Sequence, residues 1–499
     1  MFVQKNKSKE SECFMVNSIQ HFAQEGAKKL SSVFEKYTDD LTKIAEMVYG
    51  VTEEVVNLGT SIIAEEWESY DELLRNRREL RPGWYIVRKD SVTRTTSLGD
   101  VTYKRTLFKN KESGESCYLL DQLMGIEKHT RITEDAVARI LEEASESSYR
   151  KGGAKASVIG ADITKETVMN KIHSLRFPAL EVPDKKVVAE KLFIDADEDH
   201  VALQYLSEKG DIKKNKSNTA MPYIVYVYEG IDVELGGKPK LVNPKYFGGL
   251  YEGSSGIKQF WNEVNAYIEK AYDTDSIKKI YINGDGAAWI KSGTKYVSRS
   301  KFRLDKYHMH KYIITATAHL GDSADDARSE LYRAIHKKKK AMAETTFNKI
   351  LNVTEAETKR KAVEQSRDYI LGNWAGIVRS MTGEDKCIGC SAEGHVSHVF
   401  SDRMSSRPLG WCLTGVDKMA RLRIYRQNNC SILKLVRCQK TEFKMAAGAE
   451  DVVFSSSQVI QAERKKRREQ GYLADIPVYT IPYPHIKKIA ALKNHIWGL

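Results

Sequence analysis

The chain has 499 residues, which at roughly 100–200 residues per domain predicts two to four domains. Lys and Arg total 79 against 67 Asp and Glu, a net charge of +12, and 41% of the residues are hydrophobic. This composition excludes a wholly disordered chain. No apolar run reaches the ~18 residues that span a bilayer, and the N-terminus lacks the apolar core of a signal peptide, so we expect no membrane segment. Seven Cys, sparse and odd in number, argue against a disulfide framework and favour a reducing cytosol.

The charge is distributed unevenly along the chain. Residues 1–80 hold 10 Lys/Arg against 15 Asp/Glu, whereas residues 402–499 hold 18 against 8. A polyanion would neutralise such a basic region and release its condensed counterions, which is the usual source of non-specific DNA affinity. The alternative is a solvated basic surface that keeps the protein soluble. The overall balance favours a nucleic acid as partner.

The first 80 residues have a helical pattern, and the next 30 have the pattern of short strands. Residues 17–80 are predicted to be helical with one buried face, formed by Phe22, Leu30, Val33, Ile44 and Val48. Pro82-Gly83 ends this pattern, and residues 84–88 and 101–108 are predicted strands on either side of a turn at 97–100. We therefore expect an acidic helical region followed by a small β element.

A second helical region follows. One helix is predicted from about Glu134, and a second near 164–175, joined by a basic, Gly-bearing connection at 150–157. Lys165 and Lys171 lie off the apolar face of the second helix, so the segment is compatible with a helix-turn-helix DNA reader. The alternative is a pair of packed helices with solvated charges. Two prolines within 177–183 indicate a domain boundary.

The middle of the chain has the pattern of an α/β domain with a mixed sheet. Apolar runs that predict strands and a helix alternate along it, and residues 247–256 are predicted to be a Gly-rich loop. The predicted strands are 191–197, 201–205, 223–229 and 280–285, and the predicted helix is 257–272. Residues 323–381 are helical throughout by pattern.

Carboxylates stand at the ends of two predicted strands. Asp197 closes one strand and Asp285 the other, and carboxylates beyond strand ends can converge although they are far apart in sequence. Asp195 would share a face with Asp197, so the choice between these two stays open. Oxygen ligands of this kind suit Mg²⁺. The alternative is that each Asp forms a turn or caps a helix N-terminus.

Two further elements could carry chemistry. Asp305 and His308 are three residues apart and could touch on one helical turn. Residues 387–398 include a Cys/His set that resembles a zinc site, but its four members span only twelve residues: Cys387, Cys390, His395 and His398. We prefer a helix in which Glu393 shares a face with Val396 and Phe400, an orientation that turns Glu393 inward to the sheet as a third metal ligand.

Several separate stretches, taken in order and spacing, resemble the ISLre-type insertion-sequence transposases, a bacterial group distantly similar to Mutator-like transposases. They include Asp-Ala-Asp-Glu-Asp-His from residue 195 and Asn-Gly-Asp-Gly-Ala-Ala-Trp from residue 283. The resemblance covers about residues 60–495, and its stretches are 96–106, 118–121, 195–204, 282–290, 302–308, 389–398 and 406–411.

The resemblance implies a multidomain α/β protein with an RNase H-like mixed-sheet catalytic core and an all-α insertion. The expected division is an acidic helical region at 1–80, a small β element with a helix-turn-helix-like DNA-binding region at 81–180, the first part of the core at 185–310, the insertion at 311–385 and the second part of the core with a basic region at 386–499. A DDE triad is implied at Asp197, Asp285 and Glu393, with Asp195 as the rival for the first position.

The resemblance also implies the chemistry. Two Mg²⁺ or Mn²⁺ ions would support hydrolysis of a DNA phosphodiester at the element end and then attack of the new 3′-hydroxyl on target DNA. The Asp305/His308 pair looks like the acid-x2-His element of such transposases. Basic residues after Glu393 are suited to hold phosphates, and each of them could equally be a solvated charge: Arg403, Arg407, Lys418, Arg421 and Arg423. The run at 464–468 is expected to form a helix face that contacts DNA backbone or solvent.

The expected partners are the double-stranded terminal repeats of the element and target DNA, bound by a homo-oligomer in the bacterial cytoplasm, at the nucleoid. One alternative is a transposase-derived DNA-binding protein without catalytic activity. Another is a nucleic-acid binder stabilised by zinc on the Cys/His set.

Overall fold

A computed structural model describes residues 17–160, 162–204, 218–232, 237, 239–382, 390–407, 409–446 and 456–469. Its contacts divide the chain into two compact units. Unit 1 comprises residues 1–137, 156–162 and 448–499, and unit 2 comprises residues 138–155 and 163–447. Among the described helices, none is both long enough and apolar enough to cross a membrane.

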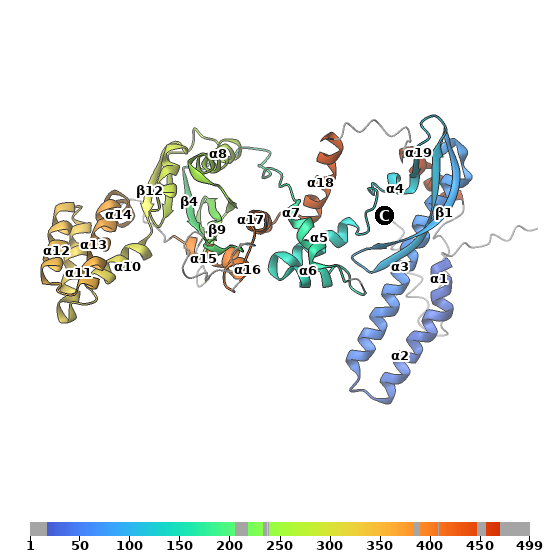
Figure 1. The fold of residues 1–499 in the computed structure, drawn as a ribbon, viewed down its shortest axis with the longest axis horizontal. Coiled ribbons are helices and arrows are strands. Elements are labelled where there is room, and N and C mark those ends of the chain that lie inside the picture. The colour runs from blue at the N-terminus through green and yellow to red at the C-terminus, as the bar shows by residue number, and fades with distance from the viewer. Residues whose placement is uncertain are drawn as a thin grey trace, which may run out of the picture. The chain divides into compact units, whose positions relative to one another are not determined.

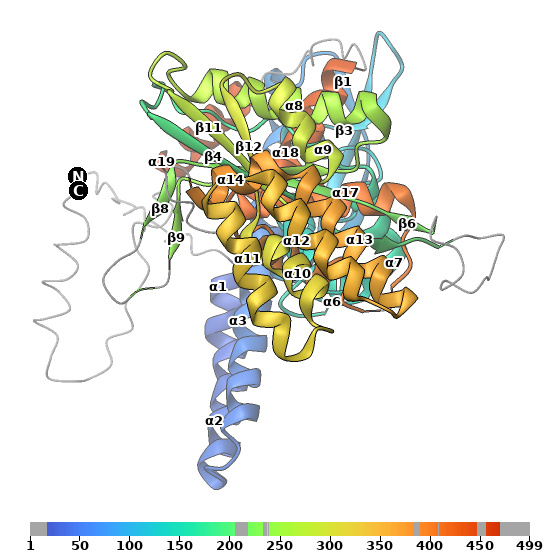
Figure 2. The ribbon, with the colours of Figure 1, turned by 90° about the vertical axis from the view of Figure 1, so that its left-hand side faces the viewer.

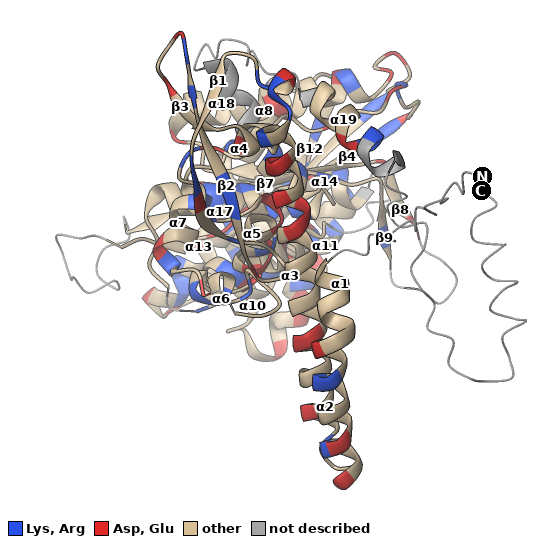
Figure 3. Ribbon diagram, turned by 90° about the vertical axis from the view of Figure 1, so that its right-hand side faces the viewer, with Lys and Arg blue, Asp and Glu red and all other residues tan. Residues whose placement is uncertain are grey.

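The first described residues of unit 1 form helices, as the sequence predicts. The short helix α1 (Asn17–His21) and a π-helical turn precede α2 (Ala27–Asp39), which pairs with the long helix α3 (Ile44–Asn76) in an antiparallel hairpin (Figure 2). Gly50 allows α3 to approach Val33 closely. Acidic side chains are spread along this hairpin (Figure 3).

The predicted buried face of this region is only partly correct. Leu30 and Val33 are half-buried, but Ile44 is 58% exposed and Val48 is 50% exposed. The reason is that a two-helix hairpin covers a single narrow stripe of each helix. The remaining apolar positions of α3 stay open to solvent.

A sheet of three described strands completes unit 1. Strands β1 (Trp84–Thr95), β2 (Asp100–Asn110) and β3 (Ser116–Tyr118) run antiparallel in that order, with the turn after β1 where the sequence predicts it. Helix α3 packs on β2, and the buried carboxylate of Asp71 accepts hydrogen bonds from the backbone N–H and hydroxyl of Thr106 at 2.8 and 2.6 Å. Leu74, Phe108 and Val459 form the core, the last from helix α19 (Ser456–Glu469).

Unit 2 contains a mixed sheet of five described strands. They are β4 (Lys191–Glu198), β7 (Tyr223–Tyr228), β10 (Lys245–Gly249), β11 (Lys279–Gly284) and β12 (Ser300–Leu304). The order across the sheet is β10-β7-β4-β11-β12, which is 3-2-1-4-5 when these strands are counted along the chain. Strands β4, β11 and β12 are parallel, β7 is antiparallel to β4, and β10 is antiparallel to β7. The prediction of a mixed α/β sheet is thus confirmed.

Three strands differ from the prediction. Strand β12 is not expected from the sequence, and residues 247–249 belong to β10, although they are predicted to open a Gly-rich loop. Of the predicted strand 201–205, only β5 (Val201–Ala202) is a strand among the described residues, and it pairs outside the five-stranded sheet. The glycines serve close packing. A Cβ on Gly248 would lie 2.6 Å from the carbonyl oxygen of Tyr223 on the neighbouring strand, and a Cβ on Gly249, whose φ is +146°, would meet Arg421.

The two faces of this sheet differ in chemistry. Because side chains alternate along a strand, Ile194 and Ala196 point to one layer, whereas Asp195 and Asp197 point to the other. The apolar layer is the main core, covered by α8 (Gly253–Ala271) through Phe260, Trp261 and Val264. On the other layer, polar side chains of three adjacent strands are buried: Asp195, Asn283 and Arg303.

Five helices follow β12 and lie together (Figure 1). They are α10 (Lys306–Thr317), α11 (Ala324–His336), α12 (Lys340–Val353), α13 (Glu357–Gly372) and α14 (Trp374–Thr382). Leu331, Phe347 and Ile370 are buried where they pack. The predicted helical character of residues 323–381 is confirmed.

The expected helix-turn-helix segment has one more helix than predicted. Helices α5 (Glu134–Glu146) and α7 (Lys165–His173) lie where expected, but α6 (Tyr149–Ala154) occupies part of the predicted connection. Two glycines explain this packing, because a Cβ on Gly152 would lie 2.7 Å from the side chain of Ala144, and a Cβ on Gly153 would overlap the carbonyl oxygen of Ile163. The unit boundary falls within α5.

Candidate active site

The parallel strands β4 and β11 bring their carboxyl ends to one edge of the sheet. Asp197 is the penultimate residue of β4, and Asp285 directly follows β11. Burial raises the pKa of Asp197 to about 7, and the negative charges of Glu198, Asp285 and Glu393 act in the same direction. The carboxylates predicted from strand ends are therefore near enough to repel one another.

The backbone around Asp285 is held by specific contacts. Its Oδ1 accepts a hydrogen bond from the N–H of Ala287 at 2.8 Å, and its carbonyl oxygen accepts one from the Tyr369 hydroxyl. Gly286 has a φ of +94°, and a Cβ there would lie 2.7 Å from Asn373. The turn after β11 thus requires glycine, and it fixes the direction of the Asp285 carboxylate.

Glu393 lies on the short helix α15 (Ala392–Val396), and its side chain is 65% exposed. The expectation that it turns inward with Val396 and Phe400 is wrong, since only these two are buried. The expectation assumed a continuous α-helix, whereas α15 has five residues and continues as a π-helix at Ser397–Ser401. The wider π turn changes the position of Phe400 relative to Glu393. Val396 lies in α15 together with Glu393, and at a spacing of three residues the two side chains are about 60° apart around the helix axis, so Val396 can be buried while Glu393 is exposed.

The predicted Asp305–His308 contact is present. Asp305 caps α10 by accepting a hydrogen bond from the N–H of Tyr307 at 3.0 Å, and its other oxygen lies 3.0 Å from Nδ1 of His308. Nε2 of the same ring lies 3.6 Å from Oε1 of Glu393. The hydrogen bond to Asp305 raises the pKa of His308, and the charges of Asp285 and Glu393 raise it further. The imidazole therefore links α10 to Glu393.

Glu198 is a site residue that the sequence reasoning did not single out. Its Oε2 accepts a hydrogen bond from Nε1 of Trp289 at 2.6 Å, and burial together with the charge of Asp285 raises its pKa. The sequence feature that could have identified Glu198 is its position next to Asp197 at the strand end. The alternation of side chains along a strand argues against it, because neighbouring residues are expected to point to opposite faces of the sheet.

Asp195 occupies a different environment from Asp197. It is completely buried, and it accepts hydrogen bonds from Tyr226, Tyr228, Asn283 and the N–H of Ser391. The distances are 2.8, 3.1, 2.7 and 3.1 Å in that order. Asp195 and Asp197 are thus only two residues apart on β4, yet Asp195 is fully hydrogen-bonded and Asp197 lies near the edge of the sheet.

The donor set at the edge suits a hard divalent cation. The converging groups are carboxylates, and their mutual repulsion would be relieved by a positive charge. Within the described residues, however, no three His, Cys, Asp or Glu side chains stand close enough together to hold a metal ion. The carboxylate oxygens therefore fit Mg²⁺ or Mn²⁺ as ligand types, but these side chains would have to move closer together to hold an ion.

The Cys/His set does not converge within the described part of the chain. Cys387 lies outside the described residues. The ring of His395 lies 4.4 Å from that of Tyr226, centroid to centroid, and Nδ1 of His398 lies 3.5 Å from Asp402. These two imidazoles thus have other partners.

The predicted DNA-contacting residues divide by exposure. Lys165 and Lys171 are exposed on α7, and Arg407 is exposed after the short helix α16 (Asp402–Met404). Arg421, on α17 (Leu413–Gln427), forms a 2.8 Å ion pair with Asp417, and its guanidinium lies over the Tyr251 ring. The exposed three are available to a polyanion, whereas Arg421 is engaged internally.

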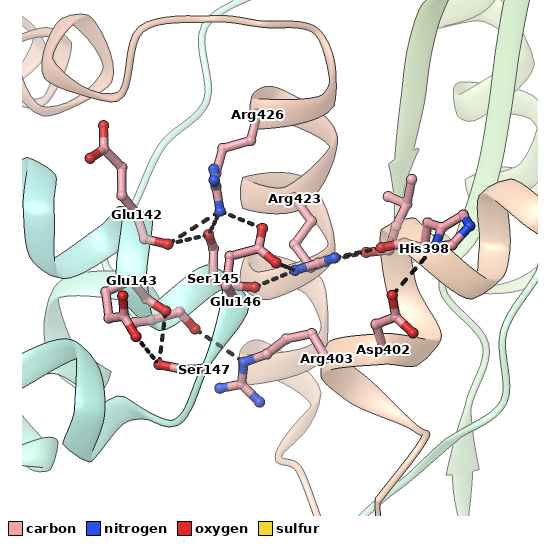
Figure 4. Close-up of polar contacts among 12 residues, drawn as sticks. Glu142, Glu143, Ser145, Glu146, Ser147, His398, Asp402, Arg403, Arg423 and Arg426 are labelled. Atoms are coloured by element: carbon pink, nitrogen blue, oxygen red, sulfur yellow. Dashed lines mark hydrogen bonds and ion pairs between the residues drawn. The ribbon is translucent and has the colours of Figure 1, made fainter.

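Arg403 and Arg423 are buried, which departs from their predicted role as phosphate contacts. They and Arg426 converge on the C-terminal end of α5, where a helix leaves carbonyl oxygens without intrahelical partners (Figure 4). The carbonyl oxygens that accept from these three arginines are those of Ala144, Ser145 and Glu142, in that order. Positive charges at this end also interact favourably with the negative end of the helix dipole. The contacts give both buried arginines a structural role.

Comparison with known proteins places the chain in a family. Residues 37–442 match the family described as "Uncharacterised protein family (UPF0236)". Two UPF0236 proteins of Caldanaerobacter subterraneus subsp. tengcongensis are 36% and 37% identical over 406 and 404 residues, covering 80% and 79% of this chain and 81% of each relative. The Drosophila P element transposase strand transfer complex is a weak structural match, at 9% identity and a TM-score of 0.21 over 71% of this chain and 90% of that one. By sequence, the chain belongs to the UPF0236 family.

Proposed function

We propose that this protein is a DDE transposase of an insertion sequence, which binds the element ends and catalyses metal-dependent DNA cleavage and strand transfer. The observation that carries the proposal is the electrostatic coupling of Asp197 to Asp285 and Glu393, three carboxylates from separate elements. Repulsion among carboxylates at a sheet edge is the arrangement that a cation-dependent phosphodiester site needs before its ions bind.

The topology supports an RNase H-like core as part of the same proposal. The 3-2-1-4-5 order, with the first, fourth and fifth strands parallel, is the order expected of such a core. Helices α10–α14 lie between Asp285 and Glu393 in the chain, where the resemblance to ISLre-type transposases requires an all-α insertion. The proposed core therefore comprises residues 185–310 and the segment that begins at 386.

The proposed site would hold two Mg²⁺ or Mn²⁺ ions on Asp197, Asp285 and Glu393. Such ions, when bound, activate water and stabilise the leaving oxygen of a phosphodiester. The chain's own part is to hold these carboxylates in place: the Gly286 turn directs Asp285, and His308, oriented by Asp305, lies against Glu393. Hydrolysis at the element end would leave a 3′-hydroxyl to attack target DNA at the same site.

The naming of one relative is consistent with a mobile element. The name of the 36% identical UPF0236 protein joins eleven locus designations of a single strain. An insertion sequence that copies itself within a genome places its transposase gene at many loci. We extend this inference from the relative to the present chain.

DNA is the proposed partner, as terminal repeats and as target, bound by a homo-oligomer at the bacterial nucleoid. The net charge of +12 favours a polyanion. Lys165, Lys171 and Arg407 are the exposed candidates for phosphate contacts. Arg403 and Arg423 leave this set because they are buried against α5.

Cleavage of a labelled duplex that carries the terminal repeat tests the proposal. Asp285→Asn should abolish nicking in Mg²⁺ or Mn²⁺ and leave the shift of the duplex unchanged, because the substitution removes a proposed ligand but no DNA contact. Asp326→Asn, the same change at an exposed position of α11, should cleave like the unaltered protein. Unchanged nicking by Asp285→Asn would refute the proposal. A protein that shifts the ends but never nicks them would instead be a transposase-derived DNA-binding protein.

A further inference from the structure

We propose that Asp195 is a positioning residue, which docks the helix that carries Glu393 onto the sheet, and that it is not a metal ligand. This inference rests on the proposed function for its catalytic meaning, but its structural part stands by itself. It separates the roles of two aspartates that sequence periodicity places on the same face of β4.

The first argument is how completely the carboxylate of Asp195 is occupied. Four hydrogen bonds from described residues reach it, two on each oxygen, and none of its surface is exposed. An ionised carboxylate has about four lone-pair sites, so this one has little capacity left for a cation. Asp197, two residues further along, accepts a 2.9 Å bond from the N–H of Glu198 and feels the charges of the other carboxylates.

The second argument is the link from Asp195 to the residue just before α15. Oδ2 of Asp195 accepts both the Ser391 N–H at 3.1 Å and the Tyr226 hydroxyl at 2.8 Å. The Tyr226 and Ser391 hydroxyl oxygens are 2.7 Å apart. Since the Tyr226 proton goes to Asp195, the Ser391 hydroxyl donates to Tyr226. Ser391 is thus bound twice, and Glu393 is two residues away.

The third argument is a contact on the other side of Glu393. His395 lies with its ring 4.4 Å from that of Tyr226 and 5.6 Å from that of Tyr246, and its Nδ1 is 3.0 Å from the carbonyl oxygen of Ser391. Residues two before and two after Glu393 therefore rest on the same tyrosine. Between them the Glu393 side chain is largely exposed, and its Oε1 lies 3.6 Å from Nε2 of His308.

The hydrogen bonds of Asp195 also connect three strands. Asp195 on β4 lies opposite Tyr226 on β7 and level with Asn283 on β11, two residues before Asp285. One buried carboxylate therefore sets the Ser391 backbone relative to both strands whose ends carry Asp197 and Asp285. A shift of this contact would move Glu393 relative to the other two carboxylates.

Two tyrosines on β7 provide a matched test. Tyr226→Phe removes the hydroxyl that joins Asp195 to Ser391, whereas Tyr228→Phe removes a hydroxyl that binds the other oxygen of the same carboxylate. Hydrogen exchange of the full chain without DNA should be about tenfold faster over residues 391–400 in Tyr226→Phe, the effect expected for losing a hydrogen bond to a charged group. Tyr228→Phe and Asp197→Asn should leave exchange in this segment unchanged.

Cleavage supplies the second readout. Tyr226→Phe should need a higher Mn²⁺ concentration for half-maximal nicking and should bind the terminal repeat normally. Equal exchange over 391–400 in the two tyrosine variants would overturn the proposal, and so would a Tyr226→Phe protein whose Mn²⁺ requirement is unchanged while the unaltered protein cleaves. If the unaltered protein never cleaves but the exchange difference is found, the docking role stands and the transposase proposal fails.

Discussion

The two faces of the sheet in unit 2 are both buried, yet they are built from different chemistry. On one face the side chains of Ile194, Val225 and Ile282 pack against α8 and the helices that follow β12. On the other, Asp195, Asn283 and Tyr226 form a hydrogen-bonded group beneath α15. Burying a polar group is costly unless it is hydrogen-bonded. The apolar face thus contributes stability, and the polar face determines how the segment above it, α15, is oriented.

This difference explains why candidate site residues gather on one side. An apolar layer tolerates small shifts, since dispersion contacts have no preferred direction. Hydrogen bonds constrain both distance and angle, so a layer of them restricts where the overlying helix can sit. The segment that carries Glu393 is attached to the hydrogen-bonded, polar face of the sheet.

The largest expected effect comes from breaking the apolar face. Ile194→Ala leaves a cavity in the core, and we expect the free energy of unfolding to fall by about 2–5 kcal/mol. Urea denaturation followed by tryptophan fluorescence measures this loss. Val188→Ala, at an exposed position shortly before β4, should change stability by less than about 0.5 kcal/mol. A similar loss in both variants would contradict the assignment of the core.

A smaller effect should follow from breaking the polar face. Asn283→Ala removes the 2.7 Å donor to Asp195 and leaves a buried carboxylate oxygen short of a partner, which should cost about 1–3 kcal/mol. Asn265→Ala, which removes a solvent-exposed hydrogen bond to Glu269 on α8, is the matched control and should be nearly neutral. If Asn283→Ala were as stable as this control, the polar network would not be needed to hold the sheet.

A pH-dependent effect, absent near pH 4, concerns Asp197 at the edge of the sheet. The pKa of Asp197 is about 7, above its usual range, so the folded chain retains a proton there that the unfolded chain has lost. Stability from this group therefore falls as pH rises from about 4 to about 7 and stays reduced above it. Asp197→Asn should raise the Tm by several degrees at pH 8 and change it little at pH 4, because the substitution removes the buried charge. Mg²⁺ at pH 8 should stabilise the unaltered protein more than the variant, and equal Tm values at pH 8 would refute the raised pKa.

Local pattern was enough to predict much of the fold. Strands β4, β7 and β11 are short apolar runs, and the helices after β12 show clear 3.6-residue periodicity, so both were predicted. Strand β10 was missed because Gly248 and Gly249 resemble a loop, although they serve close contact with β7 and α17. A contact with another strand cannot be predicted from the local periodicity of apolar residues.

The candidate site was less accessible to such reasoning. Asp195 and Asp197 share a face by alternation, and what separates them is Ser391, almost two hundred residues later in the chain. Glu393 and the buried Val396 are three residues apart on α15, a spacing that is compatible with burial of both or of only one, so the exposure of Glu393 could not be predicted from the pattern of apolar residues. Likewise, Ile44 and Val48 have helical spacing, but spacing does not say whether another element covers them.

The arginine contacts at the end of α5 affect how the net charge should be counted. Arg403 and Arg423 are among the 18 basic residues of the region 402–499, but their guanidinium groups face carbonyl oxygens of the protein itself. A charge held in this way displaces no cations from a DNA duplex. Each phosphate neutralised contributes about 0.9 to the slope of log affinity against log salt concentration. That slope should therefore follow the exposed lysines and arginines, and a count of basic residues from composition would overstate how steeply salt weakens binding.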